Sequence, residues 1–150
     1  MIYYKGTTKI VLKESVLRTF EMYKQTGRKH ERGGIVLGKV KKNKIVLTRA
    51  SIPTGYDWGN RTSFVRHKMS GQLFTDYEFL NSNGKVIYLG EWHTHPEDHP
   101  TPSSTDKKMI AKQFNRNDIN EEFLFMIIIG RRSIYVAYYD GKTLTELRSK

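Results

Sequence analysis

The sequence predicts a mixed α+β fold of the α/β class, in which one mixed sheet is flanked by about three helices. Hydropathy patterns typical of helices and of strands alternate along the chain, an order that favours helices packed against a sheet. At 150 residues the chain is long enough for one packed core and short for two. No repeat, low-complexity segment or linker divides it, so we expect a single domain spanning residues 1–150.

The first half of the chain begins with a predicted helix and a predicted hairpin. Ser15 is a candidate N-cap for an apolar stripe at helical spacing that stops at Gly27. The apolar runs 33–40 and 44–51 are separated by three residues and predict two antiparallel strands. The turn-rich segment 53–60 predicts a loop.

A short strand and a second helix are predicted next. Residues 62–66 favour the strand. The helix is indicated by apolar residues that share one helical face and end before Asn83 and Gly84. These apolar residues are Met69, Leu73, Tyr77 and Leu80.

The second half is predicted to alternate strand, helix and hairpin. The run 85–92 predicts a strand that leads to His93, and a helix is expected to begin near Ser103. Residues 123–130 are almost wholly apolar, as expected of a strand buried on both faces. The segment 133–147 predicts a final hairpin, with its turn at Asp140 and Gly141.

Composition excludes several classes of function. The chain has no cysteine, which excludes a disulfide framework, a thiolate metal site and a cysteine nucleophile. It has no early apolar run typical of a signal peptide and none near the ~20 residues of a membrane span, so we expect a cytoplasmic protein without a membrane partner. The formal charge of +11 is spread along the chain without a nucleic-acid-binding motif, so we do not expect nucleic acid as the partner.

The segment GEWHTHPEDHPTPSSTD, residues 90–106, carries a candidate metal site. His93 and His95 are two residues apart at the end of a predicted strand, so their imidazoles point to one side and can chelate one ion. Asp106, in the first turn of the predicted helix, can supply an oxygen ligand. Three protein ligands leave a fourth position for water, which is typical of catalytic zinc sites.

Each part of this pattern has a simpler explanation. Two histidines on a strand are weak evidence by themselves, because histidines are common on surfaces and in satisfied core positions. Ser103 followed by Asp106 is also a capping box at the start of a helix. The two interpretations of Asp106 are compatible, since a capped first turn would help to hold its carboxylate in place.

These residues resemble a known metallopeptidase family. The string HTHPEDHPTPSSTD has the spacing HxHx7SxxD of the JAMM motif of JAB1/MPN metallopeptidases, and ERGGIVLG (31–38) resembles the family's upstream glutamate segment. The resemblance covers nearly the whole chain. It implies a JAB1/MPN fold with Glu31 on a strand, and one Zn²⁺ ion held by His93, His95 and Asp106.

The same resemblance implies how an amide is hydrolysed. Glu31 would accept a proton from the attacking water and return it to the leaving amine. Ser103 would donate a hydrogen bond to the oxyanion. Glu91 is the alternative base, because it has the same strand parity as the two histidines.

Within the family, the chain resembles the standalone bacterial JAB peptidases of CBASS antiphage operons, which implies a deubiquitinase-like isopeptidase. Its partners would be a ubiquitin-like modifier, or a cGAS-like nucleotidyltransferase conjugated through its C-terminal tail. Two alternatives are a peptidase that processes sulfur-carrier proteins and a non-catalytic MPN scaffold. Tyr56 and Trp58 lie where relatives form part of the groove for the tail, and they are candidate substrate-binding residues or ordinary loop aromatics.

Overall fold

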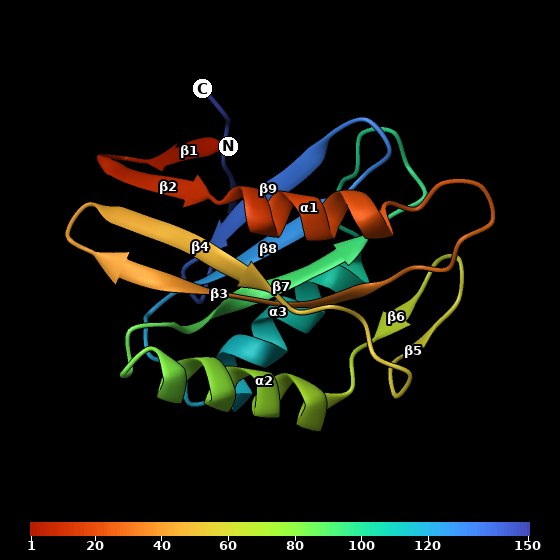
Figure 1. Cartoon of the computed structure of the whole chain (residues 1–150). Helices are drawn as coiled ribbons and strands as arrows, with labels where there is room; N and C mark the ends of the chain where they lie inside the picture. Colours follow the sequence, from red (N-terminus) through yellow and green to blue (C-terminus); the bar gives the residue numbers. More distant parts are fainter.

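Eight strands join into one mixed sheet in the order β1-β2-β4-β3-β7-β8-β9-β10 in the computed structural model, which describes residues 1–150 (Figure 1). Neighbouring strands are antiparallel except for the parallel pairs β2–β4 and β7–β8. A separate hairpin is formed by β5 and β6. The strands are β1 (Ile2–Lys5), β2 (Thr8–Leu12), β3 (Gly33–Lys41), β4 (Lys44–Ala50), β5 (Trp58–Gly59), β6 (Phe64–Val65), β7 (Ile87–Thr94), β8 (Leu124–Ile129), β9 (Ile134–Tyr139) and β10 (Leu144–Glu146).

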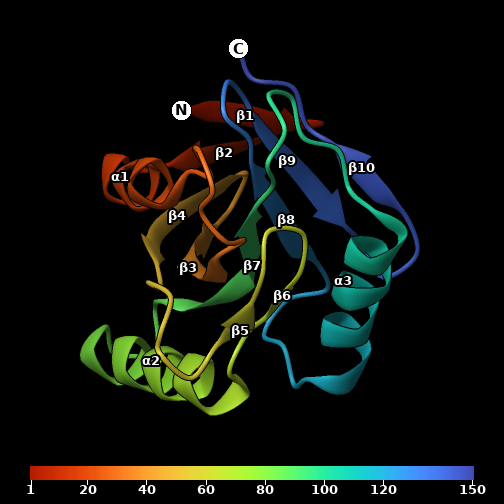
Figure 2. The ribbon, with the colours of Figure 1, turned by 90° about the vertical axis from the view of Figure 1, so that its right-hand side faces the viewer.

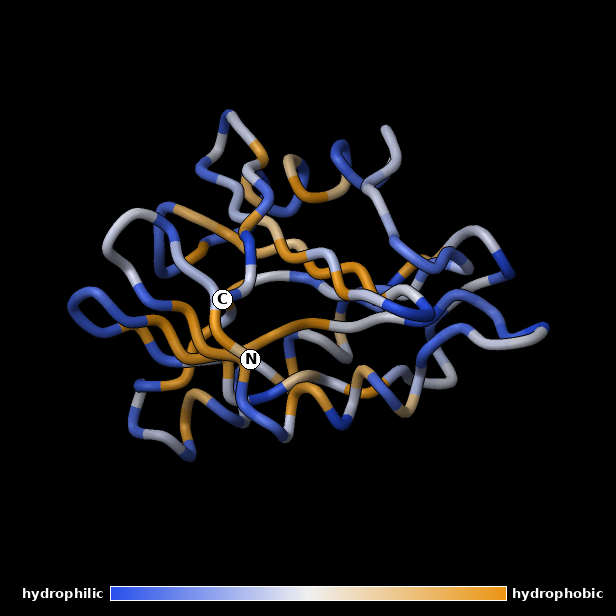
Figure 3. Tube along the Cα trace, turned by 90° about the horizontal axis from the view of Figure 1, so that it is seen from above, coloured by the Kyte–Doolittle hydropathy of each residue, from blue (hydrophilic) through white to orange (hydrophobic).

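Three helices flank this sheet, which confirms the predicted fold class. Figure 1 shows α1 on one face of the sheet and α2 and α3 on the other. The two faces have separate apolar cores: Phe20 of α1 belongs to the larger one, and Ile110 of α3 to the smaller one. In Figure 3 the hydrophobic colouring follows the strands through the middle of the molecule, and the hydrophilic colouring gathers at the turns. The helices are α1 (Glu14–Tyr23), α2 (Lys68–Asn81) and α3 (Ser104–Arg116).

Most of the predicted elements are confirmed. The β3–β4 hairpin and the β9–β10 hairpin form as antiparallel pairs, and every residue of β8 is buried. The loop predicted at 53–60 is irregular except for the two residues of β5. No strand was predicted at β1 and β2, because lysines and a glycine interrupt their apolar residues.

The boundaries predicted for α1 are wrong. Lys13, not Ser15, is the N-cap residue, and it makes no side-chain capping bond. The Ser15 hydroxyl instead donates a hydrogen bond to the Thr48 carbonyl, which ties the helix to β4. The helix ends at Tyr23, and Gly27 lies in the following turn with φ of +60°.

The predicted second helix is confirmed as α2, but its apolar stripe faces solvent. The residues that share this stripe, Met69, Leu73, Tyr77 and Leu80, are all between 63% and 75% exposed. The helix packs through its opposite side, where Gly71 is buried and Phe74 contacts the small cluster of Ile35, Leu37 and Val86. No helix of the protein is long and apolar enough to cross a membrane.

The pairing of β3 with β7 positions the candidate site. Because the two strands are antiparallel and Gly33 lies opposite His93, the segment just before β3 lies beside the end of β7. Gly33 is required for this close approach, since a Cβ atom there would lie 2.3 Å from the Trp92 carbonyl oxygen. Segments 60 residues apart in the chain thereby meet at one end of the sheet.

Candidate active site

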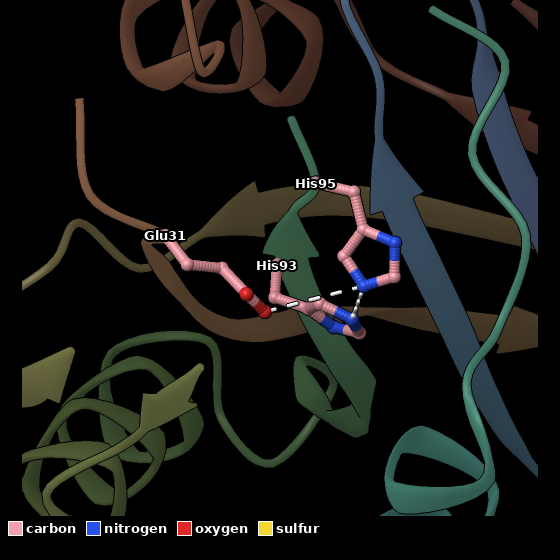
Figure 4. Close-up of side chains that lie close together, drawn as sticks. All are labelled: Glu31, His93 and His95. Atoms are coloured by element: carbon pink, nitrogen blue, oxygen red, sulfur yellow. Dashed lines mark hydrogen bonds and ion pairs between the residues drawn. The ribbon is translucent and has the colours of Figure 1, made fainter. Parts of the chain in front are cut away.

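The two motif histidines converge at the end of β7. His93 is in the strand and His95 directly follows it, and both are buried. Their Nε2 atoms lie 3.1 Å apart. Figure 4 shows the two imidazole rings turned toward each other. This is the chelating arrangement that a two-residue spacing on a strand predicts.

Asp106 reaches the same point from the first turn of α3. Its Oδ1 lies 3.1 Å from His93 Nε2 and its Oδ2 lies 3.1 Å from His95 Nε2. The structure therefore brings together two imidazole nitrogens and a carboxylate, a donor set that suits zinc. The nitrogens and oxygens lie close enough to one another to share one ion.

The capping box at the start of α3 is also present. The Asp106 amide donates to Ser103 Oγ over 3.1 Å, and the Ser103 amide donates to Asp106 Oδ2 over 2.8 Å. These two bonds fix the Asp106 carboxylate where it faces the histidines. Asp106 therefore caps the helix and contacts the histidines at the same time. Ser103 is exposed, and it lines the cavity in front of the histidines.

Glu31 lies on the other side of the histidines. Its side chain is buried and points toward His95, with Oε1 4.0 Å from Nε2 (Figure 4). The prediction that this glutamate lies on a strand is wrong, because β3 begins two residues later, at Gly33. Glu31 is instead carried by the irregular segment that connects α1 to β3.

Burial and neighbouring charges shift the pKa values of these groups. Burial raises the pKa of Glu31 to about 7, which the charge of His95 opposes and that of Asp106 increases. Burial also acts to raise the pKa of Asp106, but its hydrogen bonds with the two histidines outweigh this and hold the pKa well below its usual range. The pKa of His95 is raised, because its contacts with Asp106 and Glu97 outweigh the effect of burial.

Glu91, the alternative base, is held by an arginine. Its carboxylate is buried and accepts one bifurcated hydrogen bond from Arg66 Nε, at 3.1 and 3.2 Å to its two oxygens, and a second bond from Nη2 at 2.7 Å. As its strand parity predicted, Glu91 lines the same cavity as the histidines. Its oxygens are nevertheless hydrogen-bonded to a cation, whereas Glu31 makes only the longer contact of 4.0 Å with His95 Nε2.

Three contacting residues were missed by sequence reasoning. Glu97 lies with Oε1 2.8 Å from His95 Nδ1, a kind of contact that orients the histidine ligands of metal sites. Gln25 and Thr94 form a buried hydrogen-bonded pair behind the site. For Thr94 a signal existed, its position between the two histidines; for Gln25 the sequence contains none.

The site opens into a cavity of about 800 Å³ between α3 and the β5–β6 hairpin. Figure 2, which looks onto this end of the sheet, shows the hairpin between α2 and α3. Residues of the hairpin that line the cavity are Thr62, Ser63, Phe64, Val65 and Arg66. Tyr56 and Trp58 do not line it: Tyr56 is 80% exposed and packs against His67, and Trp58 is 57% exposed at the start of β5.

Comparisons with known proteins agree with this geometry. A sequence model of the prokaryotic homologs of the JAB domain matches residues 13–144. A protein named CD-NTase/cGAS isopeptidase from Escherichia coli strain TW11681 is 33% identical over 142 residues, which are 94% of this chain and 88% of that protein. Its namesake from Pseudomonas aeruginosa is 31% identical over 85% of this chain and 81% of the relative.

A third relative of the same name, from Vibrio cholerae, is 31% identical over 77% of this chain and 71% of its own length. The solution structure of protein DSY2949 from Desulfitobacterium hafniense shares the fold, with a TM-score of 0.59 at 17% identity over 91% of this chain and 88% of that one. The chain therefore belongs to the family of prokaryotic homologs of the JAB domain, and residues 13–144 carry that domain.

Proposed function

We propose that this protein is a zinc-dependent isopeptidase that cleaves the amide bond joining the C-terminus of a cGAS-like nucleotidyltransferase to its target, and so reverses conjugation in a CBASS antiphage system. The observation that carries the proposal is the convergence of His93, His95 and Asp106 within 3.1 Å of one another, with Glu31 at 4.0 Å. The family match and the relatives named as isopeptidases both support a hydrolase.

The donor set fits a zinc ion. Two imidazoles and one carboxylate match the ligand types of catalytic zinc sites. Asp106 is the better carboxylate ligand, because its oxygens are 3.1 Å from the histidine nitrogens and those of Glu31 are farther away. His93, His95 and Asp106 would therefore hold the ion, and Glu31 is left for proton transfer.

The chain's own residues then divide the work of amide hydrolysis. When bound, the ion supplies Lewis-acid activation of water and of the substrate carbonyl. Glu31 Oε1 accepts the proton of the attacking water and passes it to the amine that leaves. Ser103 Oγ accepts from the Asp106 amide, so its hydroxyl hydrogen is free to donate to the developing oxyanion.

The nucleotidyltransferase substrate is proposed from the names of the relatives. A ubiquitin-like modifier with a similar C-terminal tail is the second substrate proposed. We also propose that the exposed Tyr56 and Trp58 contact the tail of either substrate. A peptidase for sulfur-carrier proteins has the same chemistry and differs only in substrate. An enzyme is favoured over an MPN scaffold because every residue of the catalytic motif is present: Glu31, His93, His95, Ser103 and Asp106.

The direct test uses purified protein and a cGAS-like nucleotidyltransferase fused through its C-terminus to a reporter protein. We expect cleavage at the junction, loss of cleavage after dialysis against a chelator and recovery on addition of about one zinc per chain. A ubiquitin-like protein with the same reporter serves as the competing substrate. An intact fusion in the presence of zinc would contradict the proposal.

Ser103 gives a prediction that separates capping from catalysis. If the hydroxyl stabilises the oxyanion, Ser103→Ala lowers kcat by a factor on the order of 10² with little change in KM. Loss of the cap also lowers the free energy of unfolding by about 1 kcal/mol. We expect both effects in steady-state kinetics and thermal unfolding, with the kinetic loss dominant.

The matched controls keep the cap and remove the hydroxyl donor. Ser103→Asp and Ser103→Asn retain an acceptor for the Asp106 amide. Their stability should stay near that of the wild type while kcat falls. Normal turnover in a less stable Ser103→Ala enzyme would leave capping as the whole role of this residue.

A further inference from the structure

The proton acceptor of the proposed reaction lies on a segment without regular structure. Residues 24–32 connect α1 to β3 and make no strand pairing, as the long loop in Figure 1 shows. One backbone bond holds Glu31 itself, from its amide to the Asn60 carbonyl over 2.7 Å. Something else must fix the segment, because a carboxylate on a free loop would sample many positions.

Gln25 is the one polar side chain of this segment, other than Glu31, that is buried. It is 1% exposed, and each polar atom of its amide is used. Nε2 donates to the Lys29 carbonyl over 3.0 Å and to the Arg61 carbonyl over 2.6 Å. Oε1 accepts from Thr94 Oγ1 over 3.2 Å. A buried amide with this set of bonds is held in one orientation.

Thr94 carries the network to the histidines and back to the glutamate. It lies between His93 and His95 and is fully buried. Its Oγ1 accepts from the Arg32 amide over 3.0 Å, and its own amide donates to the Arg32 carbonyl over 2.8 Å. Gln25 therefore holds the chain on both sides of Glu31, through Lys29 on one side and through Thr94 and Arg32 on the other.

We propose that Gln25 is a positioning residue, which fixes Glu31 relative to His93 and His95 and joins both to the β5–β6 hairpin through Arg61. This inference rests on the proposed function, since it concerns the geometry of that reaction. Gln25 touches none of the reacting groups. Its effect is on the distance and direction of proton transfer, and misplacement of a catalytic group by about 1 Å can cost on the order of 10²-fold in rate.

A purely structural role predicts a different result. If Gln25 only satisfies buried carbonyls, its loss lowers stability and leaves the kcat of the folded enzyme unchanged. If it positions Glu31, its loss lowers kcat with little change in KM or in bound zinc, because the three ligand residues stay in place. Stability, zinc content, KM and kcat must therefore be measured on the same variants.

The experiment compares Gln25→Met, Thr94→Val and the double variant. Each is assayed in the presence of zinc, at a temperature well below the Tm of that variant. We expect kcat to fall by ~10–10²-fold in each single variant, with KM and the zinc-to-protein ratio near wild type. The double variant should lose no more than the worse single variant, since both changes break one network. Val16→Ala, a change in the α1 core, is the control that lowers Tm without lowering kcat.

Each outcome decides the inference. A normal kcat in Gln25→Met, or losses that multiply in the double variant, would overturn it. If Gln25→Met does not fold, the comparison of Thr94→Val with Thr94→Ser decides instead. Thr94→Ser keeps the hydroxyl and should keep the kcat of the wild type. Equal kcat values in Thr94→Val and Thr94→Ser would overturn the inference. A wild-type chain that cannot cleave the fusion overturns the proposed function and this inference together.

Discussion

Glu31→Gln is expected to lower kcat roughly 10²–10⁴-fold while the protein keeps its zinc. The amide is the same size as the carboxylate but cannot accept the proton of the attacking water. Zinc is retained because His93, His95 and Asp106 converge without help from Glu31, whose nearest oxygen lies 4.0 Å from His95 Nε2. Single-turnover cleavage of the nucleotidyltransferase fusion and elemental analysis of the same sample measure the two effects.

Glu91→Gln is the matched control for this variant. Its carboxylate lines the same cavity but is bound by Arg66, so its loss should reduce stability more than catalysis. Breaking a buried ion pair by removing one partner costs about 3–5 kcal/mol, because the other charge is left uncompensated. If Glu91→Gln abolished cleavage and Glu31→Gln did not, the role of the base would pass to Glu91.

Removal of any one of the three proposed ligands should abolish metal binding and activity together. In His93→Ala, His95→Ala and Asp106→Ala, we expect zinc well below the one ion per chain of the wild type, and cleavage below detection. The two ligands that remain should bind zinc weakly. Without the ion, nothing would lower the pKa of the attacking water, so cleavage should stop. Elemental analysis after gel filtration gives the zinc-to-protein ratio.

His99→Ala provides the histidine control. Its Nδ1 lies 2.9 Å from Ser133 Oγ in an exposed contact, and His99 does not belong to the buried group of Glu31, His93 and His95. This variant should therefore keep full zinc and activity. Retention of zinc in all three ligand variants would overturn the metal site. Loss of zinc in Glu31→Gln as well would make Glu31 a fourth ligand, since its carboxylate lies within 4.8 Å of both histidines.

The sequence was most informative where local pattern and geometry coincide. A two-residue spacing on a strand puts two side chains on one face whatever the rest of the fold does, so the convergence of His93 and His95 could be predicted. The capping box at Ser103 and Asp106 is equally local. The buried strand β8 was evident because six consecutive apolar residues leave no polar face.

It was least informative where distant segments decide the outcome. The apolar stripe on α2 predicted a helix, but nothing in the local sequence says which side of the helix packs against the sheet. Gly71 and Phe74 lie on the packed side, whereas Leu73 and Tyr77 face solvent. For α1, the Ser15 hydroxyl was predicted to cap the helix, but it binds Thr48 of a neighbouring strand. The buried partner of Glu91 was equally invisible, because Arg66 is 25 residues away in the sequence.

The pairing of β3 with β7 holds Glu31 beside the histidines whatever the length of the exposed turns between the two strands. The excursion from β4 through α2 leaves one strand of this pair and returns to the other. It touches the centre through the β5–β6 hairpin, where the Asn60 and Arg61 carbonyls accept from the Glu31 amide and the Gln25 side chain. Doubling the length of a flexible loop costs only about 0.6 kcal/mol of closure entropy. The exposed turns of this excursion that lie outside the hairpin can therefore be lengthened at little energetic cost, and a reporter inserted there need not disturb hydrolysis.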